Sequence, residues 1–337
     1  MASSSISSSK AEKSYIQAGI LSNPPHRADG RALNTYRSVE LETGMAPLAN
    51  GSARVSFGRE GQHIGGGTEV IAATKLEVED LDEDGVEGGR MVCSVSCSPA
   101  AYPHLSSNAI EDLQQDMSII LHQILSNRTL HSNNLHILRG KKSWLMHLDV
   151  VVLSDAGNIY DVMFMAARAA LWDTKVPRTR SIEYKARKEG NGATGSGNMD
   201  VDETTSGFET RQLPKASDFE LHDYWDEGEV LDGRERWPVC VTLNLVPPAH
   251  YLDATLPEEA AAPLKLLVIF SFPSSSAPIL QGIRMLGQGE LDCQAVKELV
   301  QQGEKYAREL YTSLNAKLRD EDVRRNQKVF AKFSSTR

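Results

Sequence analysis

The chain has 337 residues and a formal net charge of -9, and 40% of its residues are hydrophobic, which is enough for one large core or two smaller ones. No segment approaches the roughly 18 consecutive apolar residues of a membrane-spanning helix, so we expect no membrane partner. The four cysteines form no Cys-x-x-Cys pair and have no histidine at ligand spacing. This argues against a zinc site and favours reduced thiols in a soluble, intracellular protein.

The acidic charge is concentrated in two stretches. Residues 79 to 87 (EDLDEDGVE) hold six acids and no base, and residues 201 to 236 hold eleven acids and four bases. The first stretch lacks the spacing of a calcium-binding loop, which favours a solvated hairpin and no metal. The rest of the chain is therefore mildly basic. It has no dense basic stripe, which argues against a strong autonomous nucleic-acid binder.

The first third of the chain is predicted to be a short helix followed by strands. Residues 1 to 10 are mostly serine, which predicts disorder, and residues 11 to 21 carry apolar side chains at helical spacing before SNPP ends the helix. Strands are predicted over 35–43, 51–58, 68–79 and 91–97. The turn residues between them indicate antiparallel neighbours joined by hairpins.

The glycine cluster GQHIGGGTEV (61–70) could suggest a phosphate-binding loop. Such a loop must open a helix and carry a lysine or a third glycine at fixed spacing, whereas this cluster leads into a strand. A plain hairpin turn is the favoured interpretation, and we expect no nucleotide cofactor.

The middle and end of the chain alternate between helices and strands. Residues 107–126 place apolar side chains on one face of a helix, and a strand ending at Leu153 passes through the turn SDAGNIYD into a helix to about Trp172. Strands follow over 237–246, 262–272 and 278–286, and a last helix runs from about Asp292 to Leu318. This order predicts an α+β fold with mixed sheets and packed helices.

We expect one folded domain over residues 11–320, preceded by the disordered residues 1–10. Within it, residues 185–235 are rich in Gly, Thr, Asn and charge, which predicts a mobile insertion. Residues 321–337 are predicted to be a basic C-terminal tail.

Three signatures together carry a family resemblance: RADGR (27–31), then GSARVSFG with TEVIAATKLEVE, then VVVLSDAGNIYDVMFMAARAAL. With EEAAAPLKLLVIFSF near the end, the chain resembles the RNase PH family from Ala11 to about residue 318, and within it a ring subunit of the eukaryotic RNA exosome. The resemblance implies an RNase PH-like (ribosomal protein S5 domain 2-like) fold. It also implies a place in a six-membered ring of related subunits around an RNA channel, with S1/KH-type cap subunits as further partners.

The resemblance also implies a phosphate site, and this sequence departs from it at each position. Active members have Gly-Thr-Arg in the turn where this chain has Gly157, Asn158 and Ile159, and they have paired arginines where it has Ser107 and Asn108. They carry a catalytic aspartate that by position falls near Lys265 here, and no carboxylate lies between Glu259 and Glu290. Phosphoryl transfer depends on positioning and charge neutralisation, so we predict no catalytic residue in this chain.

Local chemistry of the turn points the same way. If Asn158 is the N-cap of the following helix, Asp161 stands at the third helical position, as in a capping box. We expect its carboxylate to complement the helix dipole at the position that an incoming phosphate would take.

Three functions remain open at this point. The leading hypothesis is a non-catalytic scaffold subunit of the exosome ring that supports 3′-to-5′ RNA processing and degradation and lines part of the RNA channel, in the nucleus, nucleolus and cytoplasm. The first alternative is a phosphorolytic exoribonuclease with a diverged active site. The second is an RNA-binding module that works through its basic tail, with Arg324, Arg325, Lys328 and Lys332 as candidate RNA contacts.

Overall fold

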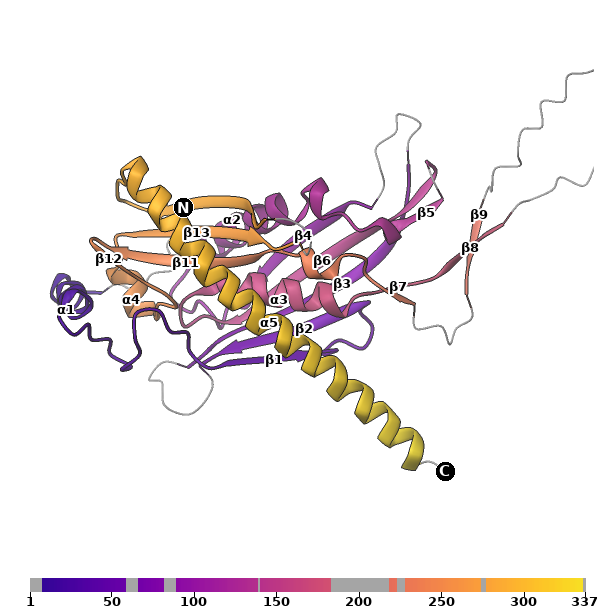
Figure 1. Ribbon diagram of the computed structural model, residues 1–337, viewed down its shortest axis with the longest axis horizontal. Coiled ribbons are helices and arrows are strands. Elements are labelled where there is room, and N and C mark those ends of the chain that lie inside the picture. The colour runs from indigo at the N-terminus through magenta and orange to yellow at the C-terminus, as the bar shows by residue number, and fades with distance from the viewer. Residues whose placement is uncertain are drawn as a thin grey trace, which may run out of the picture.

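The computed structural model describes residues 8–58, 66–81, 89–138, 140–182, 218–222, 228–273 and 277–335. Two sheets and the helices around them form the body (Figure 1). The first sheet contains β1 (Val39–Thr43), β2 (Gly51–Phe57), β3 (Thr68–Asp80), β4 (Met91–Cys97), β5 (His136–Leu138) and β6 (Lys142–Ser154). The second contains β11 (Val239–Val246), β12 (Ala249–Tyr251), β13 (Leu264–Ser271) and β14 (Ile279–Gly287).

The helices are α1 (Lys10–Leu21), α2 (Ser107–Leu125), α3 (Ile159–Asp173), α4 (Leu256–Ala261) and α5 (Cys293–Ser335), with 3-10 turns η1 (Arg128–Leu130), η2 (Asn133–Leu135) and η3 (Arg234–Arg236). Two short strand pairs, β7 (Lys175–Val176) with β10 (Glu229–Val230) and β8 (Thr179–Ile182) with β9 (Asp218–Leu221), complete the described elements. Helices packed on one mixed and one antiparallel sheet confirm the predicted α+β class.

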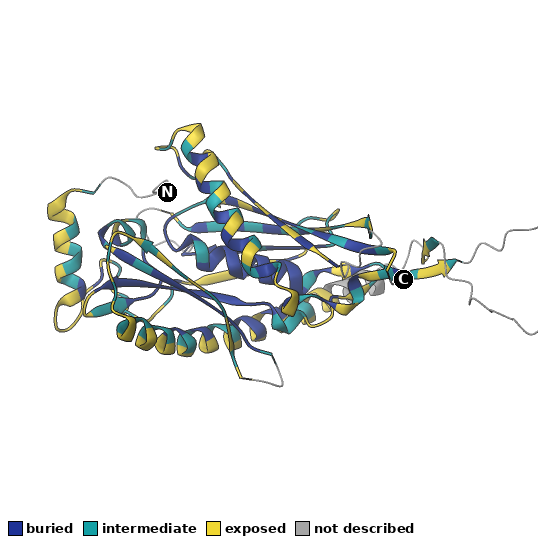
Figure 2. Ribbon diagram, turned by 90° about the horizontal axis from the view of Figure 1, so that it is seen from above, coloured by how far each residue is buried: buried dark blue, intermediate teal, exposed yellow. Residues whose placement is uncertain are grey.

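Helix α3 lies between the two sheets. It packs on β2 and β3 of the first sheet and on β11 of the second, and nearly all of its residues are buried (Figure 2). Its sequence, IYDVMFMAARAALWD, is apolar around the whole helix because no face meets solvent. The turn before this helix is therefore held inside the molecule at the junction of the two sheets.

Sheet order corrects one expectation. Strands β1, β2 and β3 are antiparallel neighbours as predicted, but β4 does not pair with β3. It lies at the sheet edge and pairs in parallel with β6, which itself pairs with β3. The connection through α2 makes a parallel neighbour possible, whereas a hairpin would require the two strands to be antiparallel.

Both chain ends differ from the predictions. Ser9 is ordered and forms a capping box with Glu12, so the helix begins inside the segment predicted to be disordered. Helix α5 does not end at Leu318 but continues to Ser335, so the residues predicted to form a separate tail extend this helix (Figure 1). The segment from Leu318 to Ser335 contains no glycine or proline that would end a helix.

Several predicted segments lie outside the described residues. These are residues 1–7, residues 61–65 of the glycine cluster, residues 82–87 of the acidic stretch, and residues 185–217 and 223–227 of the predicted insertion. The described parts of that insertion form strands β9 and β10, which pair with β8 and β7.

Candidate functional site

The turn between β6 and α3 is fixed by its backbone conformation. Gly157 has φ of +100°, and a Cβ at this position would lie 2.4 Å from the carbonyl oxygen of Ala254. Glycine is therefore required both by the left-handed conformation and by the close approach of the loop that contains Ala254. The turn is held against the segment between β12 and α4, which brings distant parts of the sequence together.

Asn158 does not cap α3 in the predicted way. It adopts a left-handed conformation with φ of 60°, whereas a side-chain N-cap needs the extended region, so its side chain accepts no hydrogen bond from the helix. Its amide nitrogen instead donates to Oδ2 of Asp161 at 3.1 Å and to Oδ1 of Asp253 at 3.2 Å. The predicted capping box is therefore wrong, and Asn158 links two buried carboxylates.

The carboxylate at the start of α3 comes from Glu259 on α4. Its Oε1 accepts a hydrogen bond of 2.7 Å from the backbone N–H of Asn158, and its Oε2 lies 2.6 Å from Nζ of Lys265 on β13. The first turn of a helix attracts anions because its N–H groups are free and its dipole is positive there. Glu259 therefore occupies the position that we assigned to Asp161 from the sequence.

Asp161 points into the core. Its carboxylate accepts hydrogen bonds from the hydroxyl groups of Thr242 at 2.7 Å and Tyr36 at 3.1 Å, and the residue is fully buried. Burial raises its pKa from 3.8 to about 6, although the bonds from Thr242, Asn158 and Tyr36 act in the opposite direction. Asp161 is thus a structural carboxylate inside the molecule.

Asp253 is the centre of a buried ionic network. Its carboxylate contacts the guanidinium groups of Arg37 and Arg31, each at 2.7 Å, and the backbone N–H of Arg37 at 2.6 Å. Burial alone would raise its pKa, but the hydrogen bonds and charge of Arg37 and the charge of Arg31 hold the pKa below its ordinary value. Arg37 also donates to the carbonyl oxygens of Ala156 and Gly157, so Asp253 fixes the turn through this arginine.

A second buried pair supports the same loop. Arg27 makes two bonds to the carboxylate of Glu258, at 2.9 and 2.6 Å, and donates to the carbonyl oxygens of Leu252 and Asp253. Arg27 and Arg31 belong to the RADGR signature, for which the sequence suggested no role. The roles of Arg37 and Glu258 were also missed, because these residues meet Asp253 and Arg27 only in the folded chain.

Asp155 connects the turn to the segment before α2. It accepts hydrogen bonds of 2.8 Å from the hydroxyl group of Tyr102 and from the backbone N–H of Gly157. Burial and the nearby charge of Glu259 raise its pKa. The side chain of Tyr102 thus joins this segment to the turn.

The other predicted phosphate-site positions offer no cation apart from Lys265. Ser107 and Asn108 are exposed at the start of α2, where Ser106 is the N-cap, and Ile159 is buried at the start of α3. Lys265 is the one cation among the predicted phosphate-site positions, and it is paired with Glu259. Among the described residues, no group of three His, Cys, Asp or Glu side chains could hold a metal.

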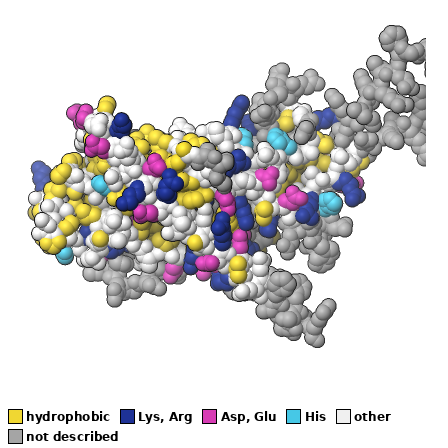
Figure 3. Space-filling view, viewed as in Figure 1, with side chains coloured by type: hydrophobic (Ala, Val, Ile, Leu, Met, Phe, Trp, Pro, Cys, Tyr) yellow, Lys and Arg dark blue, Asp and Glu magenta, His cyan; other side chains and the backbone are white. Residues whose placement is uncertain are grey.

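The candidate RNA contacts on α5 lie elsewhere. Arg324 pairs with Glu321, and Arg325 pairs with Asp173 at the end of α3. The side chains of Lys328 and Lys332 lie outside the described residues. On the face shown in Figure 3, basic and acidic side chains are interspersed. RNA contact by these residues stays a prediction.

A family model described as the 3′ exoribonuclease family, domain 1, matches residues 35–177, a range that contains the first sheet, α2, the turn and α3. Curated relatives named RRP42 or Rrp42 match a larger part of the chain. Residues 35–177 are therefore similar to the RNase PH family, and most of the chain is similar to exosome components named Rrp42.

Relatives from eukaryotes and archaea extend the match. "Putative exosome complex exonuclease RRP42" of Dictyostelium discoideum is 26% identical over 309 residues, covering 77% of this chain and 83% of the relative. Exosome complex component Rrp42 of Methanocella arvoryzae is 26% identical, covering 86% and 90%. Rrp42 of Saccharolobus islandicus is 32% identical, but the match covers only 49% of this chain and 55% of the relative.

Solved structures show the same RNase PH fold. The Archaeoglobus fulgidus exosome with RNA bound to the active site has a chain that matches with a TM-score of 0.62 at 20% identity, covering 90% of this chain and 97% of that one. An archaeal exosome core matches with a TM-score of 0.60 at 19% identity, covering 90% and 96%. The predicted RNase PH-like fold is confirmed. None of the described helices is long and apolar enough to cross a membrane.

Proposed function

We propose that this chain is a non-catalytic structural subunit of the RNA exosome core ring. In this role it supports 3′-to-5′ RNA processing and degradation by positioning neighbouring RNase PH-like subunits and lining part of the RNA channel. The relatives named as exosome components and the likeness to exosome core structures support the ring assignment. The proposed partners are other RNase PH-like subunits, S1/KH-type cap subunits and RNA in the channel.

The proposal that the subunit is non-catalytic rests on the contacts of the Glu259 carboxylate. It is held by the N–H of Asn158 on one oxygen and by Lys265 on the other, so an anion is already present at the start of α3. A second anion at this position would be repelled by the first, and only Lys265 among the predicted phosphate-site positions offers a positive charge. The buried Ile159 cannot form the charge-assisted bonds that arginine makes with phosphate.

The tail-based alternative receives less support from the contacts on α5. Arg324 and Arg325 are engaged with carboxylates of the same chain, and an RNA phosphate would have to compete with Glu321 and Asp173.

We further propose that the protein acts in the nucleus, including the nucleolus, and in the cytoplasm. Imaging of the tagged full chain tests this: signal confined to one compartment would contradict it.

Co-expression with related ring subunits tests the proposal. Native mass measurement is expected to find one copy of this chain in a six-subunit ring. The chain expressed alone is expected to aggregate or to form only weak oligomers that dissociate. A stable monomer that fails to join the ring would contradict the scaffold role. Phosphate-dependent release of nucleoside diphosphates by the purified chain, abolished by Asp253→Asn, would instead favour the diverged exoribonuclease.

A further inference from the structure

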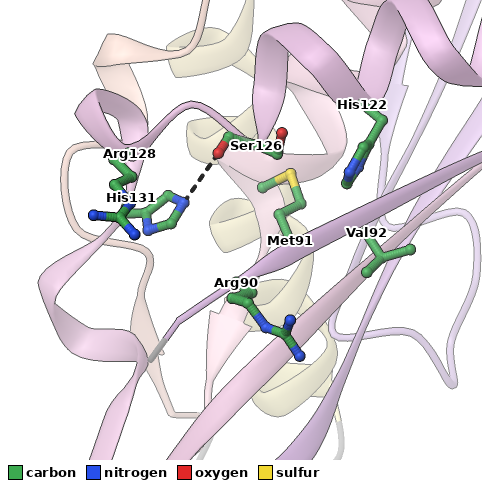
Figure 4. A pocket seen from close by; sticks show the side chains of 7 residues that line it. All are labelled: Arg90, Met91, Val92, His122, Ser126, Arg128 and His131. Atoms are coloured by element: carbon green, nitrogen blue, oxygen red, sulfur yellow. Dashed lines mark hydrogen bonds between the residues drawn. The ribbon is translucent and has the colours of Figure 1, made fainter. Parts of the chain in front are cut away.

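A cavity of about 300 Å³ lies where β4 begins and α2 ends (Figure 4). It is lined by Arg90, Met91, Val92, His122, Ser126, Arg128 and His131. Four of these seven side chains carry cationic or protonatable nitrogen atoms, and none carries a carboxylate. The volume lies at the lower end of the range for small-molecule sites.

The cavity is separate from the turn before α3. Strands β4 and β6 run in parallel, with Met91 opposite Met146 and Cys97 opposite Val152. The cavity is at the Met91 end, whereas the turn follows the Val152 end, and six strand residues span roughly 20 Å. A ligand in the cavity would therefore leave the network around Asp253 untouched.

The cationic groups converge from three segments. Arg90 immediately precedes β4, His122 belongs to the last turn of α2, and Arg128 and His131 flank the 3-10 turn that follows. In Figure 4 they are arranged around Met91, with the Nε2 of His131 3.3 Å from the carbonyl oxygen of Ser126. Convergence of such groups on one cavity is a feature of anion sites rather than of a packed core.

One ring nitrogen of His122 has no hydrogen-bond partner among the described residues. This nitrogen, Nδ1, is inaccessible to solvent. Buried polar atoms in folded proteins are nearly always paired, so this unpaired nitrogen is an unusual feature of a side chain that lines the cavity.

Two features oppose anion binding and restrict the kind of ligand. Arg90 is paired with Glu79, and the carbonyl end of α2 faces the same region. A weak monoanion would gain little there. A phosphate ester carries more charge and three acceptor oxygens, which match the fork of Arg128 and the second ring nitrogen of His131.

We propose that this cavity binds the phosphate group of a nucleotide. Arg128, His131 and His122 surround the phosphate, while the apolar side chains of Met91 and Val92 contact the nucleoside. The nucleotide is either free or part of an RNA strand, since both present the same group. This site goes beyond the proposed scaffold role, because ring assembly does not require it.

Titration calorimetry on the purified full chain tests the proposal, with AMP, adenosine, inorganic phosphate, an eight-nucleotide oligoadenylate and a glutamate-rich peptide as probes. AMP or the oligonucleotide is expected to bind, and adenosine is not. Arg128→Gln is expected to weaken binding on the order of tenfold, because it removes a charge-assisted bidentate contact. His131→Gln is expected to act in the same direction.

Lys297→Gln is the matched control, because it removes one positive charge from an exposed position on α5. The affinity of this variant for the phosphate-bearing probes is expected to stay near that of the wild type. Arg128 is exposed, so its variant should fold, and an unchanged melting temperature checks this. Binding of AMP alone identifies a free nucleotide, and binding of the oligonucleotide that weakens in Arg128→Gln identifies RNA.

Three results would overturn the proposal. The first is no heat of binding with any phosphate-bearing probe at millimolar concentrations. The second is equal affinity of wild-type, Arg128→Gln and His131→Gln chains. The third is binding of the glutamate-rich peptide alone, lost in Arg128→Gln, which would assign the cavity to an acidic protein partner. Ring assembly is tested separately by the mass of the co-expressed ring. A failure of nucleotide binding would therefore not count against the scaffold proposal.

Discussion

The ammonium group of Lys265 lies 2.6 Å from Oε2 of Glu259, while Oε1 of the same carboxylate accepts a 2.7 Å hydrogen bond from the N–H of Asn158. This relationship joins β13, α4 and the start of α3. It places a carboxylate of the chain itself where a helix start would otherwise attract an anion from solution. Glu259 thus stands at the position where the sequence led us to expect phosphate in a catalytically active protein of this kind.

The Glu259 and Lys265 pair is expected to be energetically coupled. Glu259→Gln keeps a hydrogen-bond acceptor for Asn158 but removes the charge, so the free energy of unfolding should fall by about 1 to 3 kcal/mol. In a cycle with Lys265→Met, the double variant should lose less than the sum of the single variants, by roughly 0.5 kcal/mol or more. Urea denaturation measures all four proteins, and strict additivity would show that the two side chains do not interact.

The buried network around Asp253 should depend strongly on Arg37. Arg37→Met leaves Arg31 as the one guanidinium group in contact with the carboxylate of Asp253 among the described residues, and breaking a buried pair typically costs about 3 to 5 kcal/mol. The control is Arg54→Met, which breaks a partly exposed pair with Glu69 and should cost about 1 kcal/mol or less. Equal losses in the two variants would contradict the assigned importance of the network.

The stability contributed by the Arg37 and Asp253 pair has a predictable pH dependence. The folded pKa of Asp253 is lowered, so its contribution to stability is present above the ordinary carboxyl pKa and is lost as the pH falls through the folded value. The stability difference between wild type and Arg37→Met should therefore shrink in acid. A difference that stays constant down to strongly acidic pH would argue against this linkage.

Asp161 should show the opposite dependence. Its folded pKa is about 6, above the ordinary value of 3.8, so the folded chain keeps a proton that the unfolded chain has lost between these two values. Stability due to Asp161 therefore falls as the pH rises from about 4 to about 6, by up to about 3 kcal/mol. Asp161→Asn removes this fall because an amide does not titrate in this range, and its amide can still donate to Thr242 and accept from Tyr36.

Unfolding measured at pH 4.5 and pH 7.5 tests this linkage. The stability of Asp161→Asn relative to wild type should be higher at pH 7.5 than at pH 4.5. A relative stability that is the same at both values would mean that Asp161 is ionised throughout and that its burial does not raise its pKa.

Gly157 should be much harder to replace than Gly30. In Gly157→Ala the new Cβ meets Ala254 at 2.4 Å in a left-handed backbone, so a loss of about 3 kcal/mol or more in unfolding free energy is expected. Gly30→Ala is the matched control, since Gly30 also has a positive φ but nothing lies within 4 Å of its Cβ. It should cost about 1 kcal/mol. Similar thermal shifts for both variants would refute the steric argument.

Much of the fold could be predicted because its elements carry strong local patterns. The apolar stripe of α2 is buried at Ile110, Leu113 and Met117 as expected, and the alternation of β4 matches its buried face. The place of β4 beside β6 could not be read from the same pattern, since alternation gives a strand its faces but not its neighbour. The extent of α5 was underestimated because the core-facing periodicity weakens after Leu318 while the helix continues.

The site was predicted less well than the fold. The sequence identified the turn, but assigned its carboxylate to Asp161 because the spacing from Asn158 fits a capping box. The backbone of Asn158 is left-handed, which sequence spacing cannot reveal. Glu259 was overlooked because a contact between α4 and α3 has no signal in local spacing.

Site-resolved NMR on the full chain labelled with ¹⁵N-asparagine, titrated with inorganic phosphate, tests the central claim most directly. The account predicts that the backbone amide signal of Asn158 does not shift in the wild-type chain, because Glu259 already accepts its hydrogen bond, and that no nucleoside diphosphate is released from added RNA. A saturable shift of the Asn158 signal in the wild type, accompanied by phosphate-dependent shortening of the RNA, would contradict it.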